Sequence, residues 1–366
     1  MKQYKKPAIA ILLTSLFLVA GCSAQQPAAT EPTGADEPLT KASLVLSFPR
    51  GIAWGPVEVA EQLGYYKDEG LDLEFSIAQG SGAVGQQLSS GQIKMGALSS
   101  PPLTVAFSKL DQLRAAYCVH TKGLFSFVTL EGSPIKDLTD LKGKVLGISS
   151  PSGGEVPVLT AALEEAGLVV NKDVRTKAIG HAGPQSLKAI QTGDVDAYAA
   201  GFPDIVALTA AGLELRDFTP KAYDAIPGAC LVATTSEFKS EATQKVLTGI
   251  SRAWAKASVF MLANPEAGYS VVCKAVPQEC KDEKVSSALY EKTLSLMTPG
   301  DADKVGFVNG DAWQILANSL QKAGTISSVE VKTLVSDPEL EKYRSNVLDF
   351  DHEEIKKAAK NWTGSK

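Results

Sequence analysis

The sequence predicts an α/β protein of two lobes, each built on a parallel-rich sheet flanked by helices. Strand-like apolar runs alternate with helix-like segments from residue 43 to residue 235. The alternation forms two successive series, joined by extended segments at 124–130 and 230–235. Strands separated by helices form parallel sheets with helices on both faces. The two series therefore predict two lobes, and the joining segments predict two hinge crossovers.

In the first series, the clearest strand has apolar side chains at every second position. Leu71, Leu73, Phe75 and Ile77 follow this spacing, which indicates one buried face. Strands are expected at 43–47, 71–77, 95–98 and 113–119, with helices at 55–63, after 80–82 and after 99–102.

The same order of elements repeats in the second series. Strands are expected at 124–130, 144–148, 174–179 and 196–200, with helices at 156–166, 184–192 and 202–211. A strand at 230–235 precedes helical spacing at 240–263, 282–296, 310–323 and 352–362. The expected lobes are 41–126 with 231–366, including the C-terminal helices, and 127–230.

The N-terminus reads as a secretory signal over residues 1–22. Three lysines precede an apolar run at 8–20, and Cys22 follows an Ala-Gly pair. This end resembles the bacterial lipobox, which implies that Cys22 is lipidated; the alternative is an ordinary signal with an incidental cysteine. The apolar run is shorter than the roughly 20 residues that span a bilayer. We therefore expect a lipid anchor on the extracytoplasmic face of a bacterial membrane.

Residues 23–40 are polar and rich in proline and alanine, which predicts a flexible tether. The whole chain carries a formal charge of −5. Loss of the signal removes three lysines and no acid, so the mature chain carries −8. An acidic chain without basic clusters argues against nucleic acid as a partner.

The chain has five cysteines, and four remain if Cys22 carries lipid. An even number in an exported protein permits disulfides. Cys273 and Cys280 flank a proline turn, and Cys118 and Cys230 are left as a long-range pair; the alternative for each pair is two buried free thiols. No CxxC pair or neighbouring histidine accompanies them, so no zinc site is expected.

Four segments carry a resemblance to a known family. They are VAEQLGYYKDEGLDLEF within 58–75, SGQIKMGALSS at 90–100, IKDLTDLKGKVLGISSPSGGE at 135–155 and AIQTGDVDAYAAGFPD at 189–204. In this order and spacing they resemble the type II periplasmic binding proteins for nitrate, sulfonates, taurine and thiamine-pyrimidine precursors. The likeness runs from about residue 43 to residue 267.

The resemblance implies a monomeric receptor of an ABC importer, in which two lobes close over a small-molecule ligand and the closed form docks on the permease. No cofactor is implied. Ligands of open α/β sheets bind beyond the carboxyl ends of the strands. The residues expected there are Arg50, Trp54, Gly80, Ser81, Gly82, Ser99, Ser100 and His120 in the first lobe, and Ser150, Ser152, Gly153, Gly154, His181, Phe202 and Asp204 in the second.

Three of the expected site segments are small-residue loops directly before a helix, at 80–83, 99–101 and 150–154. The N–H groups at a helix start favour anions, and glycine allows close approach. These loops predict contacts to a sulfonate, nitrate, carboxylate or phosphate group. The alternative is that they are ordinary helix caps, since serine and glycine are preferred there.

Individual side chains also have two interpretations. Arg50 is either a bidentate anion clamp or a solvated cation. Trp54 either walls the ligand or belongs to the core. His120 and His181 either line the cleft, which would make affinity change around pH 6–7, or lie there by chance. Asp204 either binds an amino group or caps a helix.

The predicted function is capture of a small organic anion, such as a sulfonate, nitrate or taurine, for an ABC importer. One alternative is a receptor for a thiamine-pyrimidine-type heterocycle, and another is a lipoprotein that senses without transport. The sequence contains no GxSxG or HExxH, and Gly143-Lys144 precedes a strand and does not open a helix as a Walker loop would. An enzyme is therefore not expected.

Overall fold

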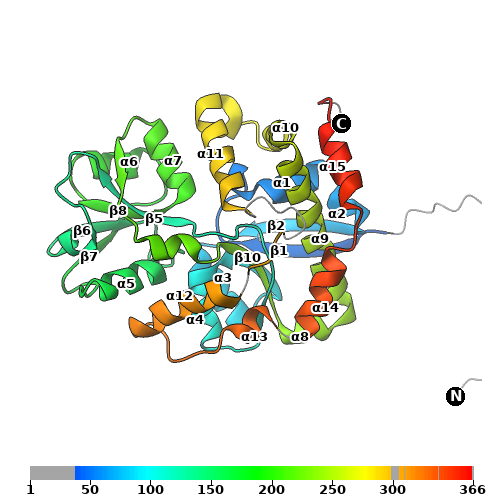
Figure 1. Cartoon of the computed structure of the whole chain (residues 1–366), viewed down its shortest axis with the longest axis horizontal. Coiled ribbons are helices and arrows are strands. Elements are labelled where there is room, and N and C mark those ends of the chain that lie inside the picture. Colours follow the sequence, from blue (N-terminus) through cyan, green and yellow to red (C-terminus); the bar gives the residue numbers. More distant parts are fainter. Residues whose placement is uncertain (1–37, 298–304, 309, 337, 365–366) are drawn as a thin grey trace, which may run out of the picture. The chain divides into compact units, whose positions relative to one another are not determined.

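The computed structural model describes residues 38–297, 305–308, 310–336 and 338–364 (Figure 1). The predicted lipidation site Cys22 and residues 23–37 of the predicted tether lie outside these ranges. Within the described ranges, no helix combines the length and the apolar composition needed to cross a bilayer.

The first sheet has the strand order β2-β1-β3-β10-β4. Its strands are β1 (Thr40–Leu46), β2 (Leu71–Ile77), β3 (Met95–Ser99), β4 (Leu113–Cys118) and β10 (Ala229–Thr234). β1 pairs in parallel with β2 and β3, whereas β10 is antiparallel to β3 and β4. This sheet therefore consists of the first predicted series plus one strand that returns from much later in the chain.

The second sheet has the strand order β7-β6-β8-β5-β9. Its strands are β5 (Phe125–Leu130), β6 (Val145–Ile148), β7 (Arg175–Ala178), β8 (Ala197–Gly201) and β9 (Leu215–Asp217). β6 is parallel to β7 and β8, and β5 is antiparallel to β8 and β9. The predicted fold class of two parallel-rich sheets is confirmed.

Two connections carry the chain between the sheets. The first runs from Cys118 to Phe125 and the second from Asp217 to Ala229. The strands that receive the crossing chain, β5 and β10, are the antiparallel ones in their sheets. The two connections pair with each other, because the Gly228 N–H donates to the His120 carbonyl at 3.0 Å. The chain therefore crosses between the sheets twice, as predicted, but just before the expected segments 124–130 and 230–235, which coincide with β5 and β10 of the sheets.

Helices cover both sheets. Those of the first lobe and the second lobe are α1 (Gly55–Gln62), α2 (Tyr65–Asp68), α3 (Ser81–Ser89), α4 (Ser100–Phe107), α5 (Val156–Glu165), α6 (Pro184–Gln191) and α7 (Phe202–Ala210). Four 3-10 helices are η1 (Ile52–Trp54), η2 (Leu138–Leu141), η3 (Lys221–Ala225) and η4 (Glu279–Lys281). The starts of α6 and α7 are visible in the sequence, because proline lies in the first turn of each helix, at Pro184 and Pro203.

The C-terminal part is helical. It comprises α8 (Thr235–Lys239), α9 (Glu241–Ala263), α10 (Pro265–Ala275), α11 (Glu283–Leu296), α12 (Gly310–Lys322), α13 (Lys332–Val335), α14 (Pro338–Val347) and α15 (His352–Lys360). The sequence placed these helices on the first lobe. In the structure α9 does pack on α1, but α11 also packs against α7 and α12 against α5, both helices of the second lobe. An apolar face in the sequence predicts that a helix is buried on that side, but it does not show which neighbouring element covers the face.

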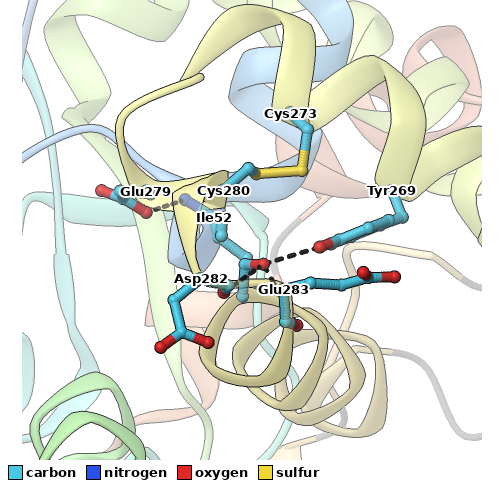
Figure 2. Close-up of a disulfide and its surroundings, with 8 residues drawn as sticks. Ile52, Tyr269, Cys273, Glu279, Cys280, Asp282 and Glu283 are labelled. Atoms are coloured by element: carbon cyan, nitrogen blue, oxygen red, sulfur yellow. Dashed lines mark hydrogen bonds between the residues drawn. A yellow bond between two sulfur atoms is a disulfide. The ribbon is translucent and has the colours of Figure 1, made fainter.

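Both cysteine pairs are joined as disulfides. Cys118 and Cys230 are register partners on β4 and β10, with an S–S distance of 2.03 Å. Cys273 and Cys280 are joined at 2.00 Å between α10 and α11 (Figure 2). The first bond is buried and joins the end of β4, where the first crossover leaves, to the start of β10, where the second crossover arrives.

Candidate functional site

A cavity of about 240 Å³ lies where the carboxyl ends of the strands of both sheets meet. Nine predicted residues line it: Gly80, Ser81, Ser99, Ser150, Gly153, Gly154, His181, Phe202 and Asp204. They lie at the carboxyl ends of β2, β3, β6, β7 and β8, in the last strand residue, the loop or the first helical turn there. Strand polarity explains this convergence, since parallel strands place the loops that follow them at one edge of a sheet.

Six predicted residues are not among the lining residues: Arg50, Trp54, Gly82, Ser100, His120 and Ser152. Arg50 donates to Glu58 at 2.9 Å and also pairs with Glu61, while its guanidinium lies 4.5 Å from the ring centre of Phe75. The geometry gives no support to an anion clamp at Arg50, because two carboxylates of α1 already hold its charge.

Trp54 and His120 form a buried layer behind the cavity wall. The Trp54 ring stacks on Phe48 with centroids 4.4 Å apart, and His120 meets the edge of Phe202 at 5.6 Å. Phe48 and Phe202 themselves line the cavity. The His120 Nε2–H donates to the Ala53 carbonyl at 2.9 Å. Both residues therefore support the wall instead of forming it.

Burial of His120 should make the protein sensitive to acid. Removal from water lowers the pKa of His120 to about 4, against an ordinary value of 6.5. Between these values the unfolded chain binds a proton that the folded chain does not, so stability falls as pH falls. We expect a loss of about 2 kcal/mol in the free energy of unfolding between pH 7 and pH 5, measured by chemical denaturation.

The variant His120→Gln should lose most of this pH dependence. His181→Gln is the control, because the pKa of His181 is shifted in the opposite direction. This variant should still lose unfolding free energy between pH 7 and pH 5. An unchanged pH dependence in His120→Gln would contradict the role given to burial.

The remaining three residues join neighbouring loops. Ser152 donates through Oγ to the Gln79 carbonyl at 2.5 Å and accepts at its own carbonyl from the Gly82 N–H at 3.1 Å. These bonds connect the loops of the two lobes beside the cavity. The Ser100 N–H donates to the Gly228 carbonyl at 2.8 Å, which ties α4 to the second crossover.

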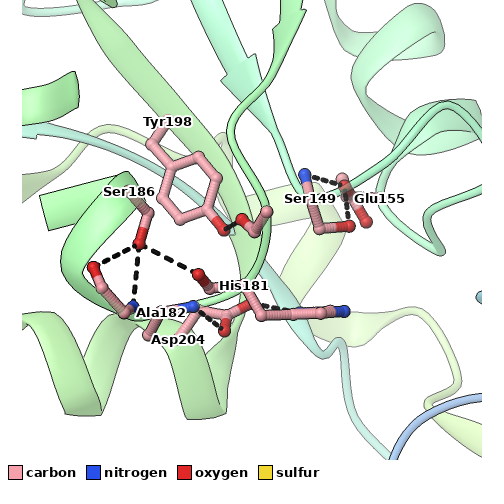
Figure 3. Close-up of polar contacts among 9 residues, drawn as sticks. Ser149, Glu155, His181, Ala182, Ser186, Tyr198 and Asp204 are labelled. Carbon is pink, nitrogen blue, oxygen red and sulfur yellow. Dashed lines mark hydrogen bonds and ion pairs between the residues drawn. The ribbon is translucent and has the colours of Figure 1, made fainter.

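Two carboxylates dominate the polar lining. Glu155 is 2% exposed, and its Oε1 accepts from the Ser149 N–H at 2.7 Å and from Ser149 Oγ at 2.5 Å (Figure 3). Burial raises the pKa of Glu155, and the Ser149 hydrogen bonds oppose that shift. No other residue that the structure describes donates to its Oε2. The Glu155 backbone N–H also contacts the carboxylate, and Oε2 can still accept from a ligand.

Asp204 holds the opposite side of the second-lobe wall. Its Oδ1 accepts from the Ala182 N–H at 2.7 Å, and its Oδ2 lies 3.1 Å from His181 Nδ1 (Figure 3). This hydrogen bond raises the pKa of His181. The Tyr198 hydroxyl donates to the Gly180 carbonyl at 2.8 Å behind the pair. Asp204 therefore orients the His181 loop as well as facing the cavity.

Several donors near the cavity are already bonded within the protein. Glu155 takes the N–H and hydroxyl of Ser149, and Asp204 takes the N–H of Ala182. Ser99 donates its N–H to Ser81 Oγ at 3.1 Å. Among the described residues that line the cavity, none is a lysine or an arginine. The described lining of the cavity is therefore acidic, with two carboxylates and no lysine or arginine.

The rest of the lining is largely apolar. Phe48, Phe125 and Phe202 line the cavity together with Leu124 and two prolines. A side chain at Gly154 would come within 2.5 Å of both the Phe125 ring and Ser99 Oγ. Glycine at this position is therefore needed for the loop to pass this close. Within the described ranges no cluster of histidine, cysteine or acidic residues could hold a metal ion.

Sequence reasoning missed several lining residues, above all Glu155 and Phe125. Glu155 directly follows the loop at 150–154, which the sequence predicts to be a serine and glycine loop for an anion. The missed signal is the acid that directly follows the two glycines. Phe125 opens the crossover strand β5, where alternation alone does not show which face meets the cavity.

The profile of the family described as NMT1/THI5 like matches residues 53–268, which is more than half of the chain. The chain belongs to the NMT1/THI5-like family. This NMT1/THI5-like chain is 21% identical over 325 residues to the riboflavin-binding protein RibY of Chloroflexus aurantiacus, covering 86% of the chain and 91% of RibY. It is 25% identical over 299 residues to the formylaminopyrimidine-binding protein of Halalkalibacterium halodurans, covering 81% of this chain and 86% of that protein.

Solved structures show the same fold. The periplasmic aliphatic sulphonate binding protein SsuA of Escherichia coli superposes with a TM-score of 0.58 and 16% identity, covering 81% of the NMT1/THI5-like chain and 92% of SsuA. The fold of the chain is therefore that of the periplasmic binding proteins.

Proposed function

We propose that this protein is an extracytoplasmic receptor that binds a small nitrogen heterocycle carrying an amino group and delivers it to an ABC importer. The observation that carries the proposal is the pair Glu155 and Asp204 in a largely apolar cavity whose described lining residues include no lysine or arginine. Carboxylates accept hydrogen bonds from amino groups and stabilise positive charge.

The apolar lining favours a flat ring. Phe48, Phe125 and Phe202 offer faces or edges to an aromatic ligand, and ring pairs are stabilised at centroid separations of about 4.5–7 Å. The volume of about 240 Å³ is below the range of about 300–1,000 Å³ that drug-sized ligands occupy. A single-ring pyrimidine suits this space better than riboflavin, which has three rings and a polyol chain.

A sulfonate or nitrate fits less well, although the sequence favoured an anion. An anion placed 4 Å from an ionised carboxylate is repelled by about 4 kcal/mol at an effective dielectric constant of about 20. The N–H groups of Ser149 and Ala182 already bond to these carboxylates, so they are not available to an anion. The alternative of a pyrimidine-type ligand is therefore the better supported one, and similarity to a formylaminopyrimidine-binding protein agrees with it.

The anchoring of the protein remains part of the proposal. The lipobox-like sequence at Cys22 and the polar tether at 23–40 support a lipid anchor on the extracytoplasmic face of the membrane. Such a tether keeps the receptor beside a permease.

Thermal unfolding and calorimetric titration with three probes test the proposal. A formylaminopyrimidine or 4-aminopyrimidine should raise the melting temperature with saturation, and methanesulfonate should not. At 100 times the dissociation constant the ligand adds about 2.7 kcal/mol to stability. Mass spectrometry should recover the ligand unchanged. Saturable binding of methanesulfonate alone would refute the heterocycle, and conversion of the ligand would indicate an enzyme.

A further inference from the structure

The loop after β1 carries one aromatic wall of the cavity. Ser47, Phe48 and Pro49 line the cavity, and the chain then turns through Gly51 into η1 and α1. The position of Phe48 depends on this turn, because Phe48 stacks on Trp54 and its carbonyl accepts from Trp54 Nε1 at 3.3 Å. Whatever fixes the start of η1 therefore also fixes Phe48.

The start of η1 is held by a side chain from far along the chain. The Ile52 N–H donates to Glu279 Oε2 at 2.8 Å, across 227 residues of sequence (Figure 2). The carboxylate lies so close to the turn that a Cβ atom on Gly51 would be 2.1 Å from Glu279 Oε1. The glycine backbone and the carboxylate are packed directly against each other.

Glu279 is in turn held on both sides. Its neighbour Cys280 is bonded to Cys273 at the end of α10, which closes a short loop (Figure 2). The Glu279 N–H donates to the Val276 carbonyl at 3.0 Å within that loop. On the other side, Asp282 caps α11 by accepting from the Val285 N–H at 3.2 Å. The loop therefore presents the Glu279 carboxylate to η1 in a fixed place.

We propose that Glu279 is a positioning residue for the ligand cavity, which it affects by holding the η1 turn and, through Trp54, the Phe48 wall. The disulfide Cys273–Cys280 is the device that keeps Glu279 in place. Glu279 itself does not line the cavity. The effect on ligand affinity rests on the proposed function, whereas the effect on the turn does not.

Hydrogen exchange of the peptide covering 47–54 tests the turn without any ligand. Loss of a hydrogen bond to a charged group, as in Glu279→Ala, should speed exchange at the Ile52 amide about tenfold or more. Glu279→Gln should restore protection, because its amide oxygen still accepts from that N–H. Glu283→Ala is the control, since Glu283 is an exposed acid four residues further along.

Gly51→Ala tests the same contact from the other side. The added methyl group must displace the Glu279 carboxylate, so it should speed exchange in the wild-type background and change little in Glu279→Ala. The double variant Cys273→Ser/Cys280→Ser should also speed hydrogen exchange at the Ile52 amide, as Glu279→Ala does. Additive effects of Gly51→Ala and Glu279→Ala would overturn the proposed contact, as would unchanged exchange in Glu279→Ala.

Titration with 4-aminopyrimidine links the turn to the site. Glu279→Ala should weaken binding about three- to tenfold, and Glu279→Gln should recover it. Wild-type affinity in Glu279→Ala would overturn the positioning role. If the wild-type protein does not bind 4-aminopyrimidine, the proposed ligand class fails, and the exchange experiment still decides the role of Glu279 at the turn.

Discussion

Replacing Glu155 with glutamine is expected to lower the affinity for an aminopyrimidine by about 100-fold, or about 3 kcal/mol. Glutamine keeps the shape of the side chain, and its oxygen still accepts from the N–H and hydroxyl of Ser149. It removes the charge that the free oxygen of Glu155 offers to the cavity. Truncating one member of a buried, hydrogen-bonded charge pair costs about 2–5 kcal/mol. Calorimetric titration measures the change directly.

Glu164→Gln is the matched control for Glu155→Gln. Glu164 lies near the end of α5, the helix that begins directly after Glu155, and does not line the cavity, so its replacement should leave affinity unchanged. The same titrations with methanesulfonate provide a second readout, because Glu155→Gln removes a repulsive charge and should reduce discrimination against anions. Equal affinities of wild type and Glu155→Gln for the aminopyrimidine would refute the assignment of Glu155 as the ligand's acceptor.

The fold was predictable because strand patterns and chain direction are local signals. The strand Leu71–Ile77 has the predicted bounds, since its alternating apolar residues run between two turns. The strand Leu215–Asp217 was missed, because three residues are too few to show alternation. Helix α10 was also missed, although Asn264 caps it by accepting from the Ala267 N–H and Pro265 begins it. The predicted helix at 240–263 ends where α9 ends, and no helix was predicted in the segment that follows it.

The candidate site was predictable in its location and less so in its chemistry. Strand polarity brought Ser81, Ser99 and Gly154 to one cavity. It could not show that Arg50 meets Glu58 and Glu61, which lie one helical turn apart on α1. It also could not show that Glu155 turns back to bond with Ser149. Both results depend on side-chain partners within ten or so residues, and together they change the expected ligand from an anion to a hydrogen-bond donor.

Breaking the disulfide Cys118–Cys230 is expected to cost about 4–5 kcal/mol in the free energy of unfolding. The bond joins residues 112 positions apart, and the whole second sheet lies between them. Closing so long a loop removes much conformational freedom from the unfolded chain, on the chain-entropy argument. Cys118→Ala/Cys230→Ala is the suitable variant, because both positions are buried in strands and serine would leave hydroxyl groups without partners.

The second disulfide provides the comparison that separates loop entropy from local packing. Cys273 and Cys280 are only 7 positions apart, so their removal should cost about 2–3 kcal/mol on the same argument. Denaturant unfolding of the two double variants measures both values. Equal losses would contradict the entropic account. A larger loss for Cys118–Cys230 would support the entropic account, in which this bond, placed where the chain leaves and re-enters the first sheet, stabilises the protein by restricting the unfolded conformations of the long segment between its cysteines.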